Sequence, residues 1–163
     1  MRKSIALLMP VVLLLGCLLM SCGTGNFVYH IFADIEECKN FELNKSEGAE
    51  VVQYESPAAD EALQDLPYSK FWAGSYTSPE LTFEIFAYEF ADNDTAMTYF
   101  ENETGARIEN KETVWRLSGG VTSSRLIVID GKNAYIAHTA TAEVDAMREF
   151  LKKSFTKELD FGA

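Results

Sequence analysis

The chain has 163 residues, of which 47% are hydrophobic and 24% are charged, enough for one domain with a buried core. Its formal net charge is −11, from 25 acidic and 14 basic residues. An acidic surface repels phosphate backbones and anionic lipid headgroups. The charge therefore argues against nucleic-acid binding and against a polybasic membrane patch.

The N-terminus has the pattern of a secretory signal. Arg2 and Lys3 precede an apolar run from about Ile5 to Leu19, and Leu19-Met20-Ser21-Cys22 ends this run with a small residue before a cysteine. This ending resembles the lipobox of bacterial lipoprotein signals. The resemblance implies that residues 1–21 are removed and that Cys22 is lipidated. The protein would then be lipid-anchored at the extracytoplasmic face of the cell membrane.

Two other interpretations of the N-terminus remain open. Leu14-Leu15-Gly16-Cys17 also fits a lipobox, but cleavage there would leave Leu18-Leu19-Met20 exposed after the lipid. Cleavage before Cys22 is favoured because it leaves a short flexible tether. The third interpretation is an uncleaved transmembrane anchor, since Ser4 to Ser21 has no charge and is close to the lower limit of about 18 residues for spanning. All three place the same domain outside the cytoplasmic membrane.

Residues 22–48 are expected to form a tether and an N-terminal segment. Apolar residues between Val28 and Phe41 have nearly helical spacing, which leaves either a helix or a short pair of strands. With Cys22 lipidated, Cys38 is the only thiol left in the mature chain. The preceding Glu36 and Glu37 would raise its pKa, so we expect a small, half-buried apolar residue and not a nucleophile.

Residues 49–163 are expected to form a single α+β domain. Glu50 to Glu55 alternates like a short strand. Ser56-Pro57 then predicts a helix that ends near Leu66-Pro67, because serine caps free amides and proline suits the first helical position. Asp60 and Glu61 would complement the helix dipole in the first turn.

A β-hairpin is predicted next, from Phe71 to Tyr76 and from Leu81 to Phe90. The Asp92-Asn93-Asp94 sequence offers N-cap side chains for a helix that stops at Gly105. This capping role explains the acids better than a calcium loop, whose glycine and final glutamate are missing.

Three strands follow in a meander, with short turns at Gly119-Gly120 and Asp130 to Asn133. Thr141 is expected to cap a final helix. The predicted strands are residues 113–118, 121–129 and 134–140, and the inward stripe of the final helix is Val144, Met147, Leu151 and Phe155. The order of elements predicts an α+β fold with an antiparallel sheet of five or six strands and helices packed on one face.

About half of the mature chain, from Leu81 to Phe155, carries a second resemblance. Its features are Tyr88-Glu89-Phe90, the helix start from Asp92 to Ala96, and the turn at Asp130-Gly131-Lys132. This stretch resembles small uncharacterised lipoproteins of Gram-positive bacteria. The resemblance implies an envelope location and a similar α+β domain, and it assigns no functional residues.

The sequence has no recognisable catalytic, cofactor or metal-binding motif. His30 and His138 have no further ligand at helical or strand spacing, and we expect His138 to bond to its neighbours in a strand. Glu84 and Glu89 are five residues apart on one predicted strand, which places them on opposite faces. We therefore expect no catalytic residue, no cofactor and no metal.

Aromatic residues give the one positive signal for a site. If helices cover Leu81, Phe83 and Ile85, the other face of the strand would present an aromatic surface to solvent. Burial of both faces is the alternative. The residues proposed for a ligand or partner surface are Trp72, Tyr76, Glu84, Phe86, Tyr88 and Phe90.

These observations predict a non-enzymatic envelope protein with a binding or assembly role. Its partners would be the membrane, through the N-terminal lipid, and another envelope protein or an extracellular ligand. The alternative is a hydrolase of envelope polymers that uses carboxylates.

Overall fold

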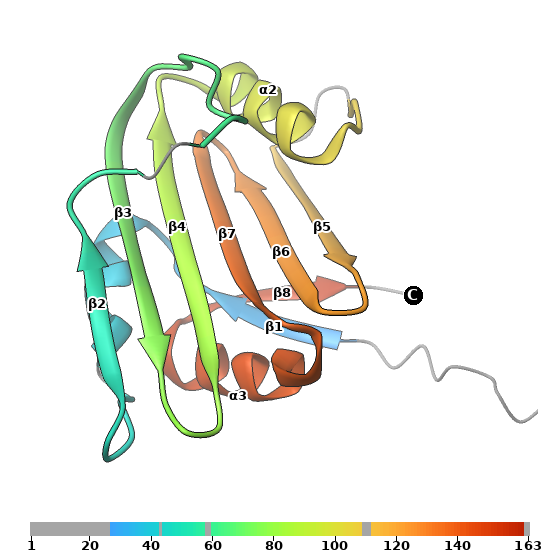
Figure 1. Ribbon diagram of the computed structural model, residues 1–163. Coiled ribbons are helices and arrows are strands. Elements are labelled where there is room, and N and C mark those ends of the chain that lie inside the picture. The colour runs from blue at the N-terminus through green and yellow to red at the C-terminus, as the bar shows by residue number, and fades with distance from the viewer. Residues whose placement is uncertain (1–26, 43, 58–59, 109–111, 162–163) are drawn as a thin grey trace, which may run out of the picture. The chain divides into compact units, whose positions relative to one another are not determined.

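The computed structural model describes residues 27–42, 44–57, 60–108 and 112–161 (Figure 1). Contacts divide the chain into a unit from Tyr29 to Leu159 and a unit made of residues 1–28 and 160–163. The first unit begins well before residue 49, where the domain was expected to start. It therefore includes most of residues 22–48, which were expected to form a tether and an N-terminal segment.

A six-stranded antiparallel sheet forms the centre of the 29–159 unit, with strand order β2-β3-β4-β7-β6-β5. Two three-stranded meanders meet where β4 pairs with β7. The strands are β2 (Glu50–Tyr54), β3 (Tyr68–Thr77), β4 (Thr82–Phe90), β5 (Thr113–Gly119), β6 (Ser123–Asp130) and β7 (Asn133–Ala140). The predicted α+β fold with an antiparallel sheet is confirmed, as is the hairpin of β3 and β4.

A helix follows each meander. Helix α2 (Asn93–Thr104) is capped by Asp92, which accepts a hydrogen bond from the Thr95 amide, and it ends at Gly105 in the left-handed region, as predicted. Helix α3 (Val144–Ser154) follows the short 3₁₀ turn η2 (Thr141–Glu143). Glu143, the residue at the N-cap of α3, makes no capping hydrogen bond with its side chain. The expected cap, Thr141, instead donates to the Gly120 carbonyl.

For the segment from Val28 to Phe41, the sequence predicted either a helix or a short pair of strands. The structure has one strand and one 3₁₀ helix there. Strand β1 (Phe27–Ile31) precedes the 3₁₀ helix η1 (Ile35–Glu42), and β1 pairs with β8 (Lys157–Phe161) in a separate two-stranded sheet. Strand β8 was not predicted from the sequence. Phe32 packs edge-on against Tyr135 and Phe155, with ring centroids 4.3 and 4.8 Å apart.

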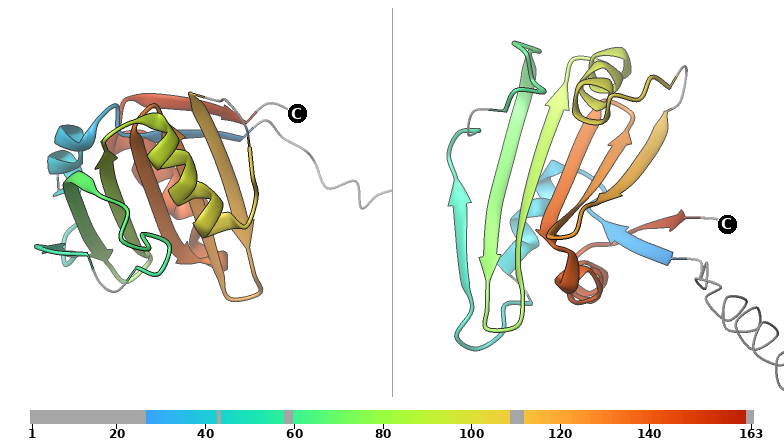
Figure 2. Two further views of the ribbon diagram at one scale, coloured as in Figure 1. Left: turned by 90° about the horizontal axis from the view of Figure 1, so that it is seen from above. Right: turned by 45° about the vertical axis from the view of Figure 1, so that its right-hand side comes forward.

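One face of the large sheet, here called the Phe83 face, packs against η1 and α3 (Figure 2). Phe41 of η1 lies 5.5 Å from Phe83, and Phe150 of α3 lies 5.0 Å from Phe83, between ring centroids. Phe83 is 1% exposed. Together, η1 and α3 form a helical layer that buries the aromatic core on this side.

The opposite face, here called the Phe86 face, is covered only at one end. There α2 packs against the ends of β4, β6 and β7, and buries Tyr88 and Phe90 under Tyr99 and Phe100. Further along the same strands, Glu84 and Phe86 are only partly buried. The uncovered part of this face contains the site described below.

The helix predicted from Ser56 to Leu66 is not formed by the described residues of that segment, and the prediction was wrong. Residues 61–65 form consecutive turns, with Gln64 and Asp65 at φ angles of 39° and 65°. The Asp60 carboxylate accepts a hydrogen bond from the Ala62 amide. Such local bonds from aspartate compete with helix formation.

Residues 1–21, Cys17 and Cys22 lie outside the described residues, and so does the proposed signal. Among the residues that the structure does describe, no helix has both the length and the apolar character needed to cross a membrane.

Candidate ligand-binding pocket

The sheet register separates the six residues proposed for an aromatic surface. Trp72 pairs with Ala87, and Tyr76 pairs with Phe83, which places both side chains on the Phe83 face. They are 9% and 3% exposed and pack against Phe41. Their expected place beside Phe86 was wrong, because the register depends on how β3 and β4 pair and not on either strand alone.

Tyr88 and Phe90 are on the expected face but are not exposed. Helix α2 covers them, which leaves the two side chains 1% and 0% exposed. Of the six proposed residues, Glu84 and Phe86 remain accessible, and both line a pocket.

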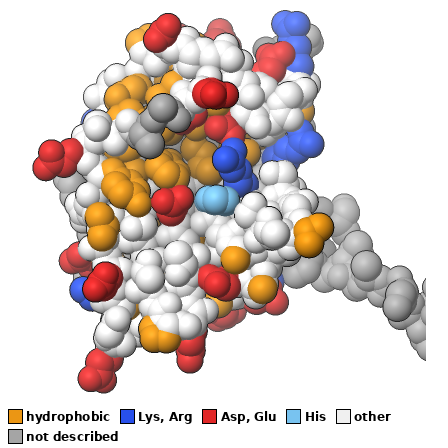
Figure 3. Space-filling view, in the orientation of Figure 1, with side chains coloured by type: hydrophobic (Ala, Val, Ile, Leu, Met, Phe, Trp, Pro, Cys, Tyr) orange, Lys and Arg blue, Asp and Glu red, His pale blue; other side chains and the backbone are white. Residues whose placement is uncertain are grey.

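The pocket on the Phe86 face, here called the Phe86 pocket, has a volume of about 550 Å³. Figure 3 shows hydrophobic side chains beside acidic, basic and histidine side chains on this face. Its wall comes from the turns before β3, from β4, from α2, and from β6 and β7. The lining residues are Asp60, Glu61, Ala62, Glu84, Phe86, Tyr99, Asn102, Glu103, Arg125, Ile136 and His138.

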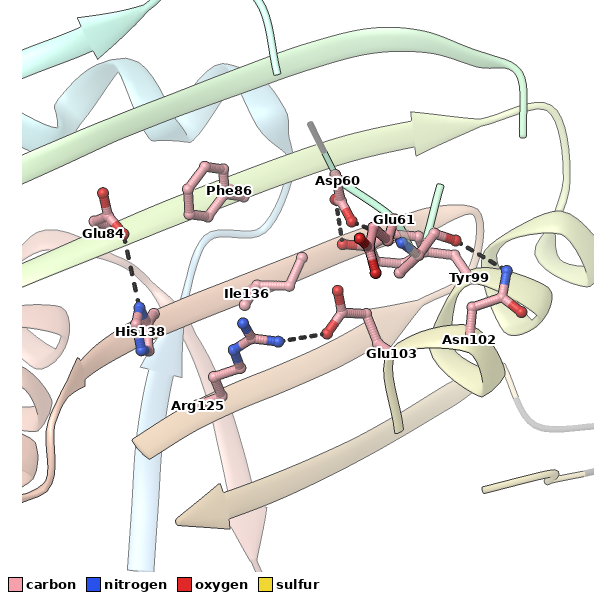
Figure 4. Close-up of a pocket in the computed structure, with 11 residues that line it drawn as sticks. Asp60, Glu61, Glu84, Phe86, Tyr99, Asn102, Glu103, Arg125, Ile136 and His138 are labelled. Atoms are coloured by element: carbon pink, nitrogen blue, oxygen red, sulfur yellow. Dashed lines mark hydrogen bonds and ion pairs between the residues drawn. The ribbon is translucent and has the colours of Figure 1, made fainter. Parts of the chain in front are cut away.

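Phe86 and Ile136 form the apolar floor of the pocket. They are direct cross-strand partners on β4 and β7, so their side chains lie next to each other on one face. Tyr54 of β2 extends this apolar surface, since its ring is nearly parallel to that of Phe86, with centroids 6.3 Å apart and an interplanar angle of 15°. Figure 4 shows the floor lying between Glu84 and His138 at one end and Asp60 at the other.

Asp60 lies at the α2 end of the pocket and is bound there by two tyrosines. Its Oδ2 atom accepts hydrogen bonds from the hydroxyls of Tyr88, at 2.9 Å, and Tyr99, at 3.0 Å. Burial and the nearby Asp60 charge raise the pKa of both tyrosines, so the hydroxyls stay protonated and donate. Both hydroxyls are neutral donors. They stabilise the negative charge of Asp60 by hydrogen bonding but do not neutralise it.

Glu103 of α2 pairs with Arg125 of β6 at the side of the pocket. Arg125 Nη1 donates to Glu103 Oε2 at 2.8 Å. The Glu103 side chain is 11% exposed, and burial raises the pKa of its carboxyl group, with a further contribution from the Asp60 charge. Arg125 acts in the opposite direction but does not reverse the shift.

Glu84 and His138 face each other across β4 and β7. Glu84 Oε2 lies 3.6 Å from His138 Nδ1, and Glu84 Oε1 accepts a hydrogen bond of 3.2 Å from the Tyr54 hydroxyl. The sequence placed His138 in a strand beside its neighbours. It did not reveal Glu84 as the cross-strand neighbour, because the two residues are far apart in the chain.

A second hollow of about 410 Å³ adjoins the first. Arg125 and His138 line both, and the second hollow continues to the turn between β5 and β6 at Ser118, Gly120 and Ser123. A ligand in the Phe86 pocket therefore has room to extend towards this turn.

Glu89 and Cys38 lie apart from the pocket. Glu89 forms ion pairs with Lys70, at 3.0 Å, and Lys132, at 2.8 Å, which is consistent with its expected separation from Glu84. Cys38 is 0% exposed, more buried than expected. Burial, followed by the Glu37 and Asp34 charges, raises its thiol pKa, which disfavours a nucleophilic role.

The pocket combines an apolar floor with several converging polar groups, an arrangement suited to binding a small molecule. Comparisons of the chain with protein-family models, with curated proteins and with solved structures find no significant match.

Proposed function

We propose that this protein is a lipid-anchored protein of the cell envelope that binds a ligand in the Phe86 pocket without changing it chemically. The lipobox-like sequence that ends at Cys22 supports the anchor. The acidic net charge of −11 agrees with a soluble domain outside the membrane surface. The ligand is extracytoplasmic under this proposal.

The observation that carries the binding role is the composition of the pocket. Its volume of about 550 Å³ falls within the range of about 300–1,000 Å³ common for small-molecule sites. Phe86 and Ile136 supply an apolar floor, while Glu84, Glu103 and Arg125 supply polar groups that can fix the orientation of a ligand.

The experiment is a fragment screen by saturation-transfer NMR on the full chain in phosphatidylcholine nanodiscs, with empty nanodiscs as the blank. His138→Trp places an indole at the pocket, where the side chain is 35% exposed and has space to change. Leu117→Trp is the matched control, because Leu117 is 40% exposed and faces the opposite side of the sheet. We expect fragment binding to be lost in His138→Trp and kept in Leu117→Trp. Equal binding by both variants would contradict the proposal.

A polymer hydrolase that uses carboxylates is the second candidate. One observation favours it: the Glu103 carboxyl has a raised pKa and faces the same pocket as Glu84. Two carboxyl groups in one pocket, one of them with a raised pKa, can supply the acid and the base of glycoside hydrolysis. Solubilisation of purified peptidoglycan, lost in both Glu84→Gln and Glu103→Gln, would favour the enzyme. Ligand binding without solubilisation would favour the binding role.

A further inference from the structure

Acidic side chains outnumber basic side chains in the lining of the Phe86 pocket. Four carboxylates line it, from Asp60, Glu61, Glu84 and Glu103, together with one guanidinium and one imidazole. Arg125 is committed to Glu103 by the hydrogen bond of 2.8 Å. The Asp60 carboxylate is held by hydroxyls and an amide, which are neutral donors. Negative charge therefore exceeds positive charge along the pocket wall.

Within the Glu103–Arg125 pair the two opposite charges lie 2.8 Å apart and offset each other. The carboxylates of Asp60, Glu61 and Glu84 then set the sign of the charge along the pocket wall. A group near this wall is favoured when it is positive and disfavoured when it is negative.

Glu84 is the carboxylate best placed to meet a ligand over the apolar floor. It is on the same strand face as Phe86, two residues away, and its side chain is 39% exposed. Its described partners are the neutral Tyr54 hydroxyl and the His138 imidazole. When His138 is neutral, neither partner cancels the charge of Glu84.

The apolar floor of the pocket favours an organic cation over a metal ion. Phe86 and Ile136 offer no oxygen or nitrogen ligand to a metal ion, whereas they can bury the apolar part of an organic cation. The ring of Phe86 also attracts a cation that lies over its face.

We infer that the Phe86 pocket binds an organic cation, in which a protonated amine lies beside the Glu84 carboxylate and an apolar body rests on Phe86 and Ile136. This inference depends on the proposed binding function and specifies its ligand class.

Isothermal titration calorimetry with three matched probes tests the inference. The probes are 2-phenylethylamine, 2-phenylethanol and 3-phenylpropionate, which share a phenyl ring and differ in head-group charge. The full chain is used in phosphatidylcholine nanodiscs at pH 8. We expect the amine to bind at least tenfold more tightly than the alcohol, and the carboxylate to bind most weakly.

Two variants test whether the preference for the amine arises in the pocket. Glu84→Gln removes the proposed partner and keeps an oxygen that can accept from Tyr54, so the preference for the amine should fall to less than threefold. Glu80→Gln removes the same charge from an exposed turn between β3 and β4 and should keep the preference. Equal preferences in the two variants would overturn the role of Glu84.

The outcomes separate the ligand class from the binding function. If the alcohol or the carboxylate binds as tightly as the amine, and His138→Trp removes that binding, the cation inference fails and the binding function stands. If none of the probes binds and the fragment screen finds no binding that depends on the pocket, both fail.

Discussion

The Tyr88 hydroxyl donates a hydrogen bond of 2.9 Å to the Asp60 carboxylate, although the two residues are 28 positions apart. The Tyr99 hydroxyl donates to the same oxygen at 3.0 Å. Because Tyr88 is on β4 and Tyr99 is on α2, one carboxylate joins the turns before β3 to both the sheet and the helix. Asp60 thus fixes the α2 end of the Phe86 pocket.

Truncation of Tyr88 should destabilise the protein strongly. Tyr88→Ala removes a ring that is 1% exposed, and we expect a loss of about 3–5 kcal/mol in the free energy of unfolding. Tyr88→Phe keeps the ring and loses one hydrogen bond, for an expected loss of about 1 kcal/mol. Urea unfolding followed by circular dichroism measures both.

Phe83→Ala is the matched comparison on the other face, where Phe83 is also 1% exposed. Similar losses for Phe83→Ala and Tyr88→Ala would agree with burial of both residues. A stability of Tyr88→Ala close to that of the wild type would mean that Tyr88 is exposed, contrary to the packing described above.

Stability should depend on the ionisation of Glu89. Hydrogen bonds from Lys132 and Lys70 lower the pKa of the Glu89 carboxyl to about 2 in the folded protein. Because the folded pKa is below the ordinary value of 4.5, the stabilisation is present above about pH 4.5 and is lost as the pH falls towards 2. The lysines are half exposed, so we expect about 1 kcal/mol or less.

The free energy of urea unfolding, measured from pH 7 to pH 3, checks this contribution. Glu89→Gln should lose less stability over this interval than the wild type, because the variant lacks the titrating group. Identical pH dependence in the two proteins would show that the ion pairs of Glu89 do not stabilise the fold.

Lipid attachment at Cys22 can be tested by substitution. Cys22→Ser should release the protein from the membrane or block its maturation, whereas Cys17→Ser should leave it anchored. Cell fractionation and mass spectrometry of the mature N-terminus distinguish these results. A modified Cys17 at the N-terminus would support cleavage at the earlier lipobox, and persistence of residues 1–21 would support a transmembrane anchor.

The elements that were predicted correctly have strong local signals. The strand from Thr82 to Phe90 alternates clearly, and α2 begins at a capping aspartate and ends at a glycine. The helix predicted from Ser56 to Leu66 was wrong although its capping pattern is also local. The Asp60 carboxylate accepts hydrogen bonds from Tyr88 and Tyr99, which lie on distant elements, and a local pattern does not reveal these contacts.

The pocket could be predicted only in part. Alternation placed Glu84 and Phe86 on one face of β4, and this much was correct. Strand order and register bring Ile136 and His138 beside them, and the packing of α2 adds Glu103. These contacts join residues distant in the chain, which periodicity along a single strand does not reveal.

The central claim is that the Phe86 pocket is the binding site, and the isoleucine methyl groups test it most directly. Ile136 lines the pocket, whereas Ile85 is 0% exposed on the Phe83 face and serves as an internal control. In methyl-labelled full chain in nanodiscs, titration with 2-phenylethylamine should shift the Ile136 δ1 methyl signal in a saturable manner and leave that of Ile85 unchanged. Saturable shifts elsewhere with an unchanged Ile136 signal would contradict the account.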